Sequence, residues 1–130
     1  MHDKLPGGNE KILFVDDESS LVEFNKERLE RLGYTVESRT DSVAALALFL
    51  SSPHAFDLVI TDMTMPRMTG DVLARELLKI RPDLPIILCT GYSARMSEEK
   101  AMELGIKKYL EKPVEMENLA RSVRQVLDRL

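Results

Sequence analysis

Short apolar runs recur along the chain, and each one stops at or beside a polar residue. Runs of this length between turn-forming residues predict strands that are buried on both faces of a sheet. These runs are residues 11–15 (KILFV), 58–62 (LVITD) and 85–90 (PIILCT). Residues 106–110 (IKKYL) are expected to form the fifth strand. A further segment, residues 34–39 (YTVESR), alternates between polar and apolar side chains and predicts a strand at the sheet edge.

Helical spacing of apolar residues fills the stretches between these strands. In the first stretch Leu21, Phe24 and Leu29 recur on one helical face, and either Ser19 or Ser20 is expected to cap that helix. The other predicted helices span residues 42–51, 71–80 and 98–104 and the segment from about 115 to 130. This alternation predicts a (βα)5 α/β domain, a doubly wound parallel five-stranded sheet of flavodoxin-like order 2-1-3-4-5.

Composition is that of one globular domain with a well-solvated surface. The chain has 130 residues, 44% of them hydrophobic and 31% charged, with a net charge of -4 and one cysteine, Cys89. The acidic balance argues against direct binding of nucleic acid, and a lone cysteine excludes a disulfide within the chain. No apolar run approaches a membrane span, so a cytoplasmic location without a membrane partner is expected. Residues 1–10 are expected to be a flexible arm or linker ahead of a domain at residues 11–130.

Polar side chains follow the predicted strands at their carboxyl ends, where an open α/β sheet binds its ligands. They are Asp16 and Asp17 after the first strand, Asp62 at the end of the third, Thr90 at the end of the fourth and Lys112 after the fifth. Three uncompensated carboxylates repel one another, and oxygen ligands without nearby Cys or His favour Mg2+ or Mn2+. A carboxylate in such a site can act as a nucleophile and form an aspartyl phosphate.

These motifs together resemble the receiver domain of bacterial two-component response regulators. The resemblance rests on D-D at 16–17, D-x-x-M-P-x-M-x-G at 62–70, T-G at 90–91 and K-P at 112–113, and it extends from about residue 11 to residue 130. It implies a phosphorelay switch that takes phosphate from the phosphohistidine of a histidine kinase or a histidine phosphotransfer protein. It also allows a homodimer that forms on phosphorylation.

The resemblance assigns the following roles in the acidic cluster. Asp62 would be the phosphoacceptor. Asp17, Asp62 and the backbone carbonyl of Thr64 would ligate Mg2+ directly, and Asp16 would act through a bound water. Lys112 would pair first with Asp62 and then with the phosphoryl group.

Further roles concern the response to phosphorylation. Thr90 would turn to hydrogen-bond the phosphoryl group and Tyr109 would move inward behind it, which changes the face made by the fourth helix, the fifth strand and the fifth helix. The Lys112–Pro113 peptide bond would be cis. Tyr92 is bulky and is hypothesised to shield the aspartyl phosphate from water. Such a domain assists its own phosphorylation and dephosphorylation but is not a metabolic enzyme.

Other readings stay open at this point. A small magnesium-dependent phosphatase with an aspartyl-phosphate intermediate would usually carry D-x-D on its first strand, whereas the acids at 16–17 are adjacent. A flavin carrier would need a loop rich in Ser, Thr and Gly after that strand, where acids stand here. The chain could be a stand-alone regulator, a piece of a longer regulator or the receiver of a hybrid histidine kinase.

Overall fold

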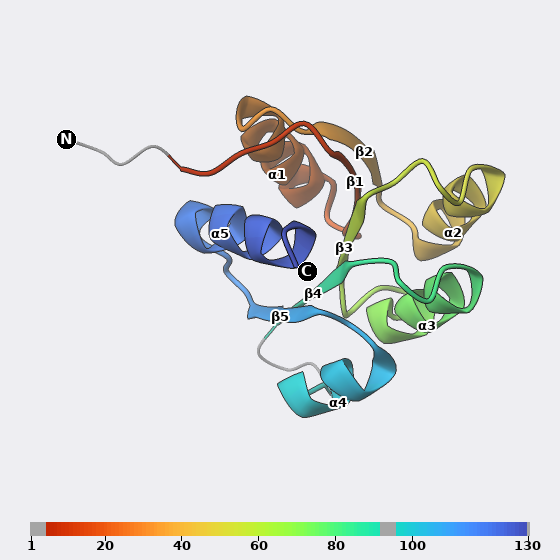
Figure 1. Cartoon of the computed structure of the whole chain (residues 1–130). Helices are drawn as coiled ribbons and strands as arrows, with labels where there is room; N and C mark the ends of the chain where they lie inside the picture. The colour runs from red at the N-terminus through yellow and green to blue at the C-terminus, as the bar shows by residue number, and fades with distance from the viewer. Residues whose placement is uncertain (1–4, 92–95, 130) are drawn as a thin grey trace.

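The computed structural model describes residues 5–91 and 96–129, in which five strands alternate with five helices around a central sheet (Figure 1). The strands are β1 (Lys11–Val15), β2 (Thr35–Arg39), β3 (Leu58–Asp62), β4 (Ile86–Thr90) and β5 (Lys108–Glu111). The helices are α1 (Ser19–Arg31), α2 (Ser42–Ser51), α3 (Gly70–Ile80), α4 (Glu98–Leu104) and α5 (Met116–Leu127). No helix in the described ranges is long and apolar enough to cross a membrane.

The sheet confirms the predicted doubly wound topology. All neighbouring strands pair in parallel in the order β2-β1-β3-β4-β5. The register aligns Val15 of β1 with Thr61 of β3, and Asp62 of β3 with Cys89 of β4. The residues that follow β1 therefore meet the end of β3 at the same edge of the sheet, at the point where the strand order reverses.

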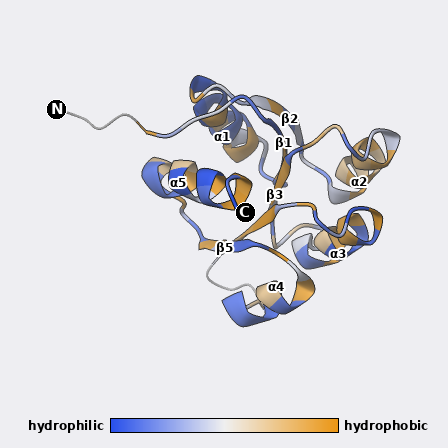
Figure 2. Ribbon diagram, in the orientation of Figure 1, coloured by the Kyte–Doolittle hydropathy of each residue, from blue (hydrophilic) through white to orange (hydrophobic). Residues whose placement is uncertain are grey.

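Each face of the sheet has its own apolar core. Helices α1 and α5 cover one face, and α2, α3 and α4 cover the other, as Figure 1 shows. The hydropathy colouring places apolar residues on the strands and on the inner sides of the helices (Figure 2). Strands β3 and β4 are buried along their whole length because helices pack on both of their faces. The carboxyl ends of these two strands, including Asp62 and Thr90, are therefore fixed by packing on both faces of the sheet.

The first helix differs in detail from its prediction. Val22 and Leu29 are its buried residues, whereas the side chain of Phe24 is 52% exposed. Its N-cap is Glu18, without a side-chain cap hydrogen bond, and not Ser19 or Ser20. A stripe at helical spacing can be drawn through either Leu21 or Val22, and only the packing against the sheet decides between them.

The α4–β5 junction explains why β5 starts two residues later than predicted. Gly105 caps α4 in a left-handed conformation with φ of 100°. The amide of Ile106 then donates to the carbonyl of Ala101 at 3.1 Å, so it belongs to the end of the helix and not to the sheet. Pairing with β4 begins at Lys108, opposite Ile87.

The end of the predicted arm contacts the domain. The amide of Gly8 donates to the Leu32 carbonyl at 3.1 Å, and the Glu10 carbonyl accepts from the amide of Thr35. The Glu10 carboxylate also accepts a hydrogen bond from Arg124 of α5 at 2.8 Å. Contacts with the domain therefore begin before Lys11, inside the segment that was expected to be a flexible arm.

Candidate functional site

The predicted acidic cluster forms at the carboxyl edge of β1 and β3. Asp16, Asp17 and Asp62 each offer a carboxylate oxygen, and these oxygens all lie within 4.8 Å of one another. Asp16 is 2% exposed and Asp62 is 6% exposed, whereas Asp17 faces solvent. The amide of Glu18 donates to one oxygen of Asp16 at 3.1 Å, which orients that carboxylate at the start of α1.

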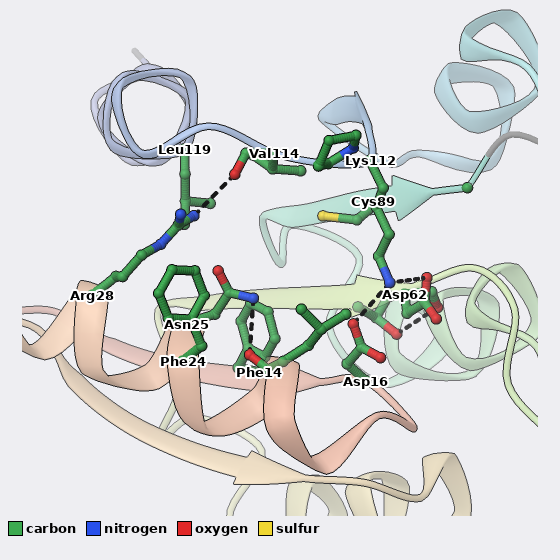
Figure 3. Close-up of a pocket in the computed structure, with 14 residues that line it drawn as sticks. Phe14, Asp16, Phe24, Asn25, Arg28, Asp62, Cys89, Lys112, Val114 and Leu119 are labelled. Carbon is green, nitrogen blue, oxygen red and sulfur yellow. Dashed lines mark hydrogen bonds and ion pairs between the residues drawn. The ribbon is translucent and has the colours of Figure 1, made fainter.

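Lys112 lies between the two buried carboxylates. Its Nζ is 2.9 Å from Oδ2 of Asp16 and 3.1 Å from Oδ1 of Asp62 (Figure 3). The lysine is placed there because its backbone amide donates to the Thr90 carbonyl at 2.8 Å, next to a cis peptide bond with Pro113. The sequence predicted a pair with Asp62 only, and the second contact, with Asp16, is a finding of the structure.

Burial and charge perturb the titration of this cluster. Burial raises the pKa of Asp62, the ammonium of Lys112 opposes that shift, and the neighbouring carboxylates add to it. Burial alone would lower the pKa of Lys112, but its hydrogen bonds to Asp16 and Asp62 raise it overall. Lys112 is therefore a cation at neutral pH and compensates part of the negative charge of the cluster.

The same cluster fits a hard divalent cation. Its donors are carboxylate oxygens, and one lysine cannot neutralise three acids. Mg2+ commonly takes one or two carboxylates together with water, and an exposed Asp17 leaves room for such waters. Thr64, the expected source of a carbonyl ligand, is exposed two residues beyond Asp62.

The loop between β3 and α3 is held tightly behind the acids. Met63 and Met65 are buried, and the amide of Gly70 donates to the Met63 carbonyl at 2.8 Å. A Cβ on Gly70 would stand 2.1 Å from the backbone oxygen of Asp62. The motif at 62–70 includes this glycine, but nothing in the sequence pattern predicts how closely its backbone approaches Asp62.

The other predicted positions lie around the acids at different depths. Thr90 is buried at the end of β4, and a Cβ on Gly91 beside it would meet no atom of the described residues within 4 Å. Tyr109 is half-buried on β5, and its hydroxyl donates to the carbonyl of Met96 at 3.1 Å, just before α4. Tyr109 thus contacts the α4 side of the domain, and no hydrogen bond in the described ranges joins it to the acids. Tyr92 lies outside the described residues.

A doubly wound sheet with acids and one lysine at its switch point is the architecture of receiver domains. Residues 12–124 match the family described as the response regulator receiver domain, and the chain belongs to that family. It is therefore a signalling domain of two-component systems, as the sequence motifs predicted.

Relatives and solved structures agree with this assignment. The probable transcriptional regulator ycf27 of Porphyridium aerugineum is 37% identical over 121 residues, which are 93% of this chain and 49% of that protein. Sensor kinase CckA of Brucella abortus is 30% identical over 94% of this chain and 13% of its own length. A receiver domain protein from Clostridium thermocellum superposes with a TM-score of 0.88 at 35% identity, covering 92% of this chain and 95% of that one. The chain spans less than half the length of the ycf27 regulator and of sensor kinase CckA.

Proposed function

We propose that this receiver domain is a phosphoacceptor switch in which Asp62 takes a phosphoryl group from the phosphohistidine of a histidine kinase or a histidine phosphotransfer protein. The observation that supports it most directly is the position of Lys112, whose ammonium hydrogen-bonds Asp62 at 3.1 Å and Asp16 at 2.9 Å. A buried carboxylate can act as a nucleophile, and a fixed ammonium group beside it can neutralise the negative charge that the phosphoryl group brings.

In the proposed reaction an oxygen of Asp62 attacks phosphorus, the phosphorus–nitrogen bond to histidine breaks, and the imidazole leaves with that electron pair. Lys112 keeps Asp62 ionised and then donates to a phosphoryl oxygen. Asp17, Asp62 and the carbonyl of Thr64 would hold Mg2+ directly and Asp16 would hold it through a water, and the ion would supply charge neutralisation at the acids and the phosphoryl oxygens. The open space beside Gly91 leaves room for the incoming group.

The proposed output is a change of the face formed by α4, β5 and α5. Phosphorylation adds about two negative charges and new acceptor oxygens next to buried Thr90. The Thr90 hydroxyl would donate to one of those oxygens, and Tyr109 would leave the Met96 carbonyl and turn inward. Because that carbonyl directly precedes α4, losing this bond would release one restraint on the helix.

The domain assists its own phosphorylation and dephosphorylation without turning over a metabolite. A homodimer formed on phosphorylation and the identity of any attached output domain remain proposals, because the chain covers at most half of its curated relatives.

Intact mass after incubation with acetyl phosphate tests the proposal. We expect one added phosphoryl group that requires Mg2+ and is absent from Asp62→Asn. Asp57→Asn is the matched control, since Asp57 is exposed at the other end of the same strand and undergoes the same chemical change. An adduct that persists in Asp62→Asn, or one lost equally in Asp57→Asn, would refute the assignment of the acceptor.

A further inference from the structure

An apolar cavity of about 320 Å³ opens between α1 and the segment that joins β5 to α5. Its walls are mostly apolar: Phe14, Leu21, Phe24, Cys89, Pro113, Val114 and Leu119. Figure 3 shows Arg28 at one end of this cavity and Asp62 with Lys112 at the other. The volume lies at the small end of the range for sites that hold small organic molecules.

Arg28 is the unusual residue of this cavity. Its Nη2 donates to the Val114 carbonyl at 3.1 Å, while its Nε is shut off from solvent and has no hydrogen-bond partner within residues 5–91 and 96–129. The guanidinium carbon lies 4.8 Å from the centre of the Phe24 ring, and no ion pair of the described residues includes Arg28. A half-buried guanidinium with one buried, unpaired N–H and no acidic partner among the described residues offers a hydrogen-bond donor to an anion.

The two ends of the cavity differ in charge. At the end that holds Asp62, three carboxylates already share the one cation Lys112, so that end disfavours a further carboxylate. At the opposite end the cation is Arg28, and its hydrogen bond to the Val114 carbonyl joins α1 to the segment before α5 (Figure 3). A cavity of about 320 Å³ suits a small organic molecule, and not a helix, as the occupant.

We propose that this cavity binds a small organic carboxylate with an apolar body, its carboxylate on Arg28 and its apolar part between α1 and α5. The carboxylate would accept hydrogen bonds from the guanidinium, including from Nε. Because Nε is shut off from solvent, a ligand would reach it only after a neighbouring side chain moves, and Phe24, which stacks on the guanidinium and is 52% exposed, is the one proposed to do so. The apolar body would cover Leu21 on one wall and Leu119 on the other.

Titration of the isotope-labelled domain with phenylpropionate, followed by amide NMR shifts, tests the proposal. We expect saturable shifts at residues of the cavity such as Val114 and Leu119. The uncharged phenylpropanamide, which has nearly the same shape, should bind at least about tenfold more weakly, since a hydrogen bond between charged groups contributes more than a neutral one. Equal binding of the two probes, or no saturation by phenylpropionate, would overturn the proposal.

Variants separate the anion contact from the cavity itself. Arg28→Gln should weaken phenylpropionate at least about tenfold and leave phenylpropanamide nearly unchanged. Arg31→Gln is the matched control, because Arg31 is exposed on the same helix and does not line the cavity. Leu21→Trp keeps Arg28 but fills the space, so it should abolish binding of both probes. Wild-type affinity for phenylpropionate in a folded Arg28→Gln variant would refute the role of Arg28.

One consequence rests on the proposed function. Because Asp62 lines the same cavity, a bound carboxylate would slow its phosphorylation, which acetyl phosphate labelling in the presence of phenylpropionate would measure. The binding measurement itself can be made on Asp62→Asn protein. Failure of the phosphoacceptor proposal would therefore leave the ligand site standing, and failure of binding would leave the phosphoacceptor standing.

Discussion

Replacing Gly70 with Ala should destabilise the domain by driving the backbone of Asp62 out of place. The added Cβ would stand 2.1 Å from the Asp62 carbonyl oxygen, 2.9 Å from its carbonyl carbon and 3.0 Å from Cδ1 of Leu88. An ordinary carbon–oxygen contact needs more than 3 Å, so the loop must move by about 1 Å against a buried strand. Overpacking of this kind costs ~1–3 kcal/mol, and alanine returns at most ~1 kcal/mol of helix propensity.

We therefore expect Gly70→Ala to lower the free energy of unfolding by about 2 kcal/mol in urea denaturation followed by circular dichroism. If Asp62 is the acceptor as proposed, its phosphorylation should slow as well, because the displaced atoms belong to that residue. Gly91→Ala is the matched control for the unfolding measurement, since a Cβ there meets no atom of the described residues within 4 Å. It is not a control for phosphorylation, because Gly91 borders the space proposed for the phosphoryl group. A Gly70→Ala protein within ~0.5 kcal/mol of wild type would refute the close-approach argument.

Three further changes test the packing and electrostatics around this frame. Lys112→Ala leaves two buried carboxylates without their cation and should lower the free energy of unfolding by about 2–3 kcal/mol in chemical denaturation. This is less than the ~3–5 kcal/mol for a fully buried pair, because the lysine side chain is 24% exposed. An unchanged denaturation midpoint would contradict this. Arg124 lowers the pKa of Glu10 below its ordinary 4.5, so this pair contributes stability above that value that is lost as the pH falls through the folded-state pKa. Wild type should consequently lose more stability than Glu10→Gln between about pH 6 and pH 3, and parallel pH profiles would argue against the pair. Arg67 has a left-handed backbone with φ of 69° and forms an ion pair with Asp41. Because glycine adopts this conformation without strain, Arg67→Gly should raise the free energy of unfolding by ~0.5–1 kcal/mol when it is made in an Asp41→Asn background that already lacks the ion pair. A lower free energy of unfolding in that background would show that the backbone of Arg67 is not strained.

Local patterns were sufficient to predict the sheet and the acidic cluster. Strands such as β3 are continuous apolar runs because both of their faces are buried, and that signal is contained in the run itself. Parallel strands then bring their carboxyl ends to one edge, which is enough to place Asp16, Asp17 and Asp62 together before any coordinates are known.

What could not be predicted depends on contacts between distant segments. Arg28 and the Val114 carbonyl are separated by 86 positions, and nothing local to either residue indicates their hydrogen bond. The pairing of Glu10 with Arg124 spans 114 positions, and nothing local to residues 1–10, which were predicted to be a flexible arm or linker, indicates it. In α1 the choice between Leu21 and Val22 as the buried residue depends on how the helix is rotated against the sheet, and helical spacing leaves that open.

The most direct test of the central claim is to locate the acyl phosphate within the chain. Protein treated with acetyl phosphate and Mg2+ is reduced with borohydride, which converts a phosphorylated aspartate to homoserine, and peptide masses then give its position. We expect homoserine at position 62, formed only when Mg2+ is present. Homoserine at Asp16 or Asp17 in place of Asp62, or an unreduced chain under conditions where another receiver domain is labelled, would contradict it.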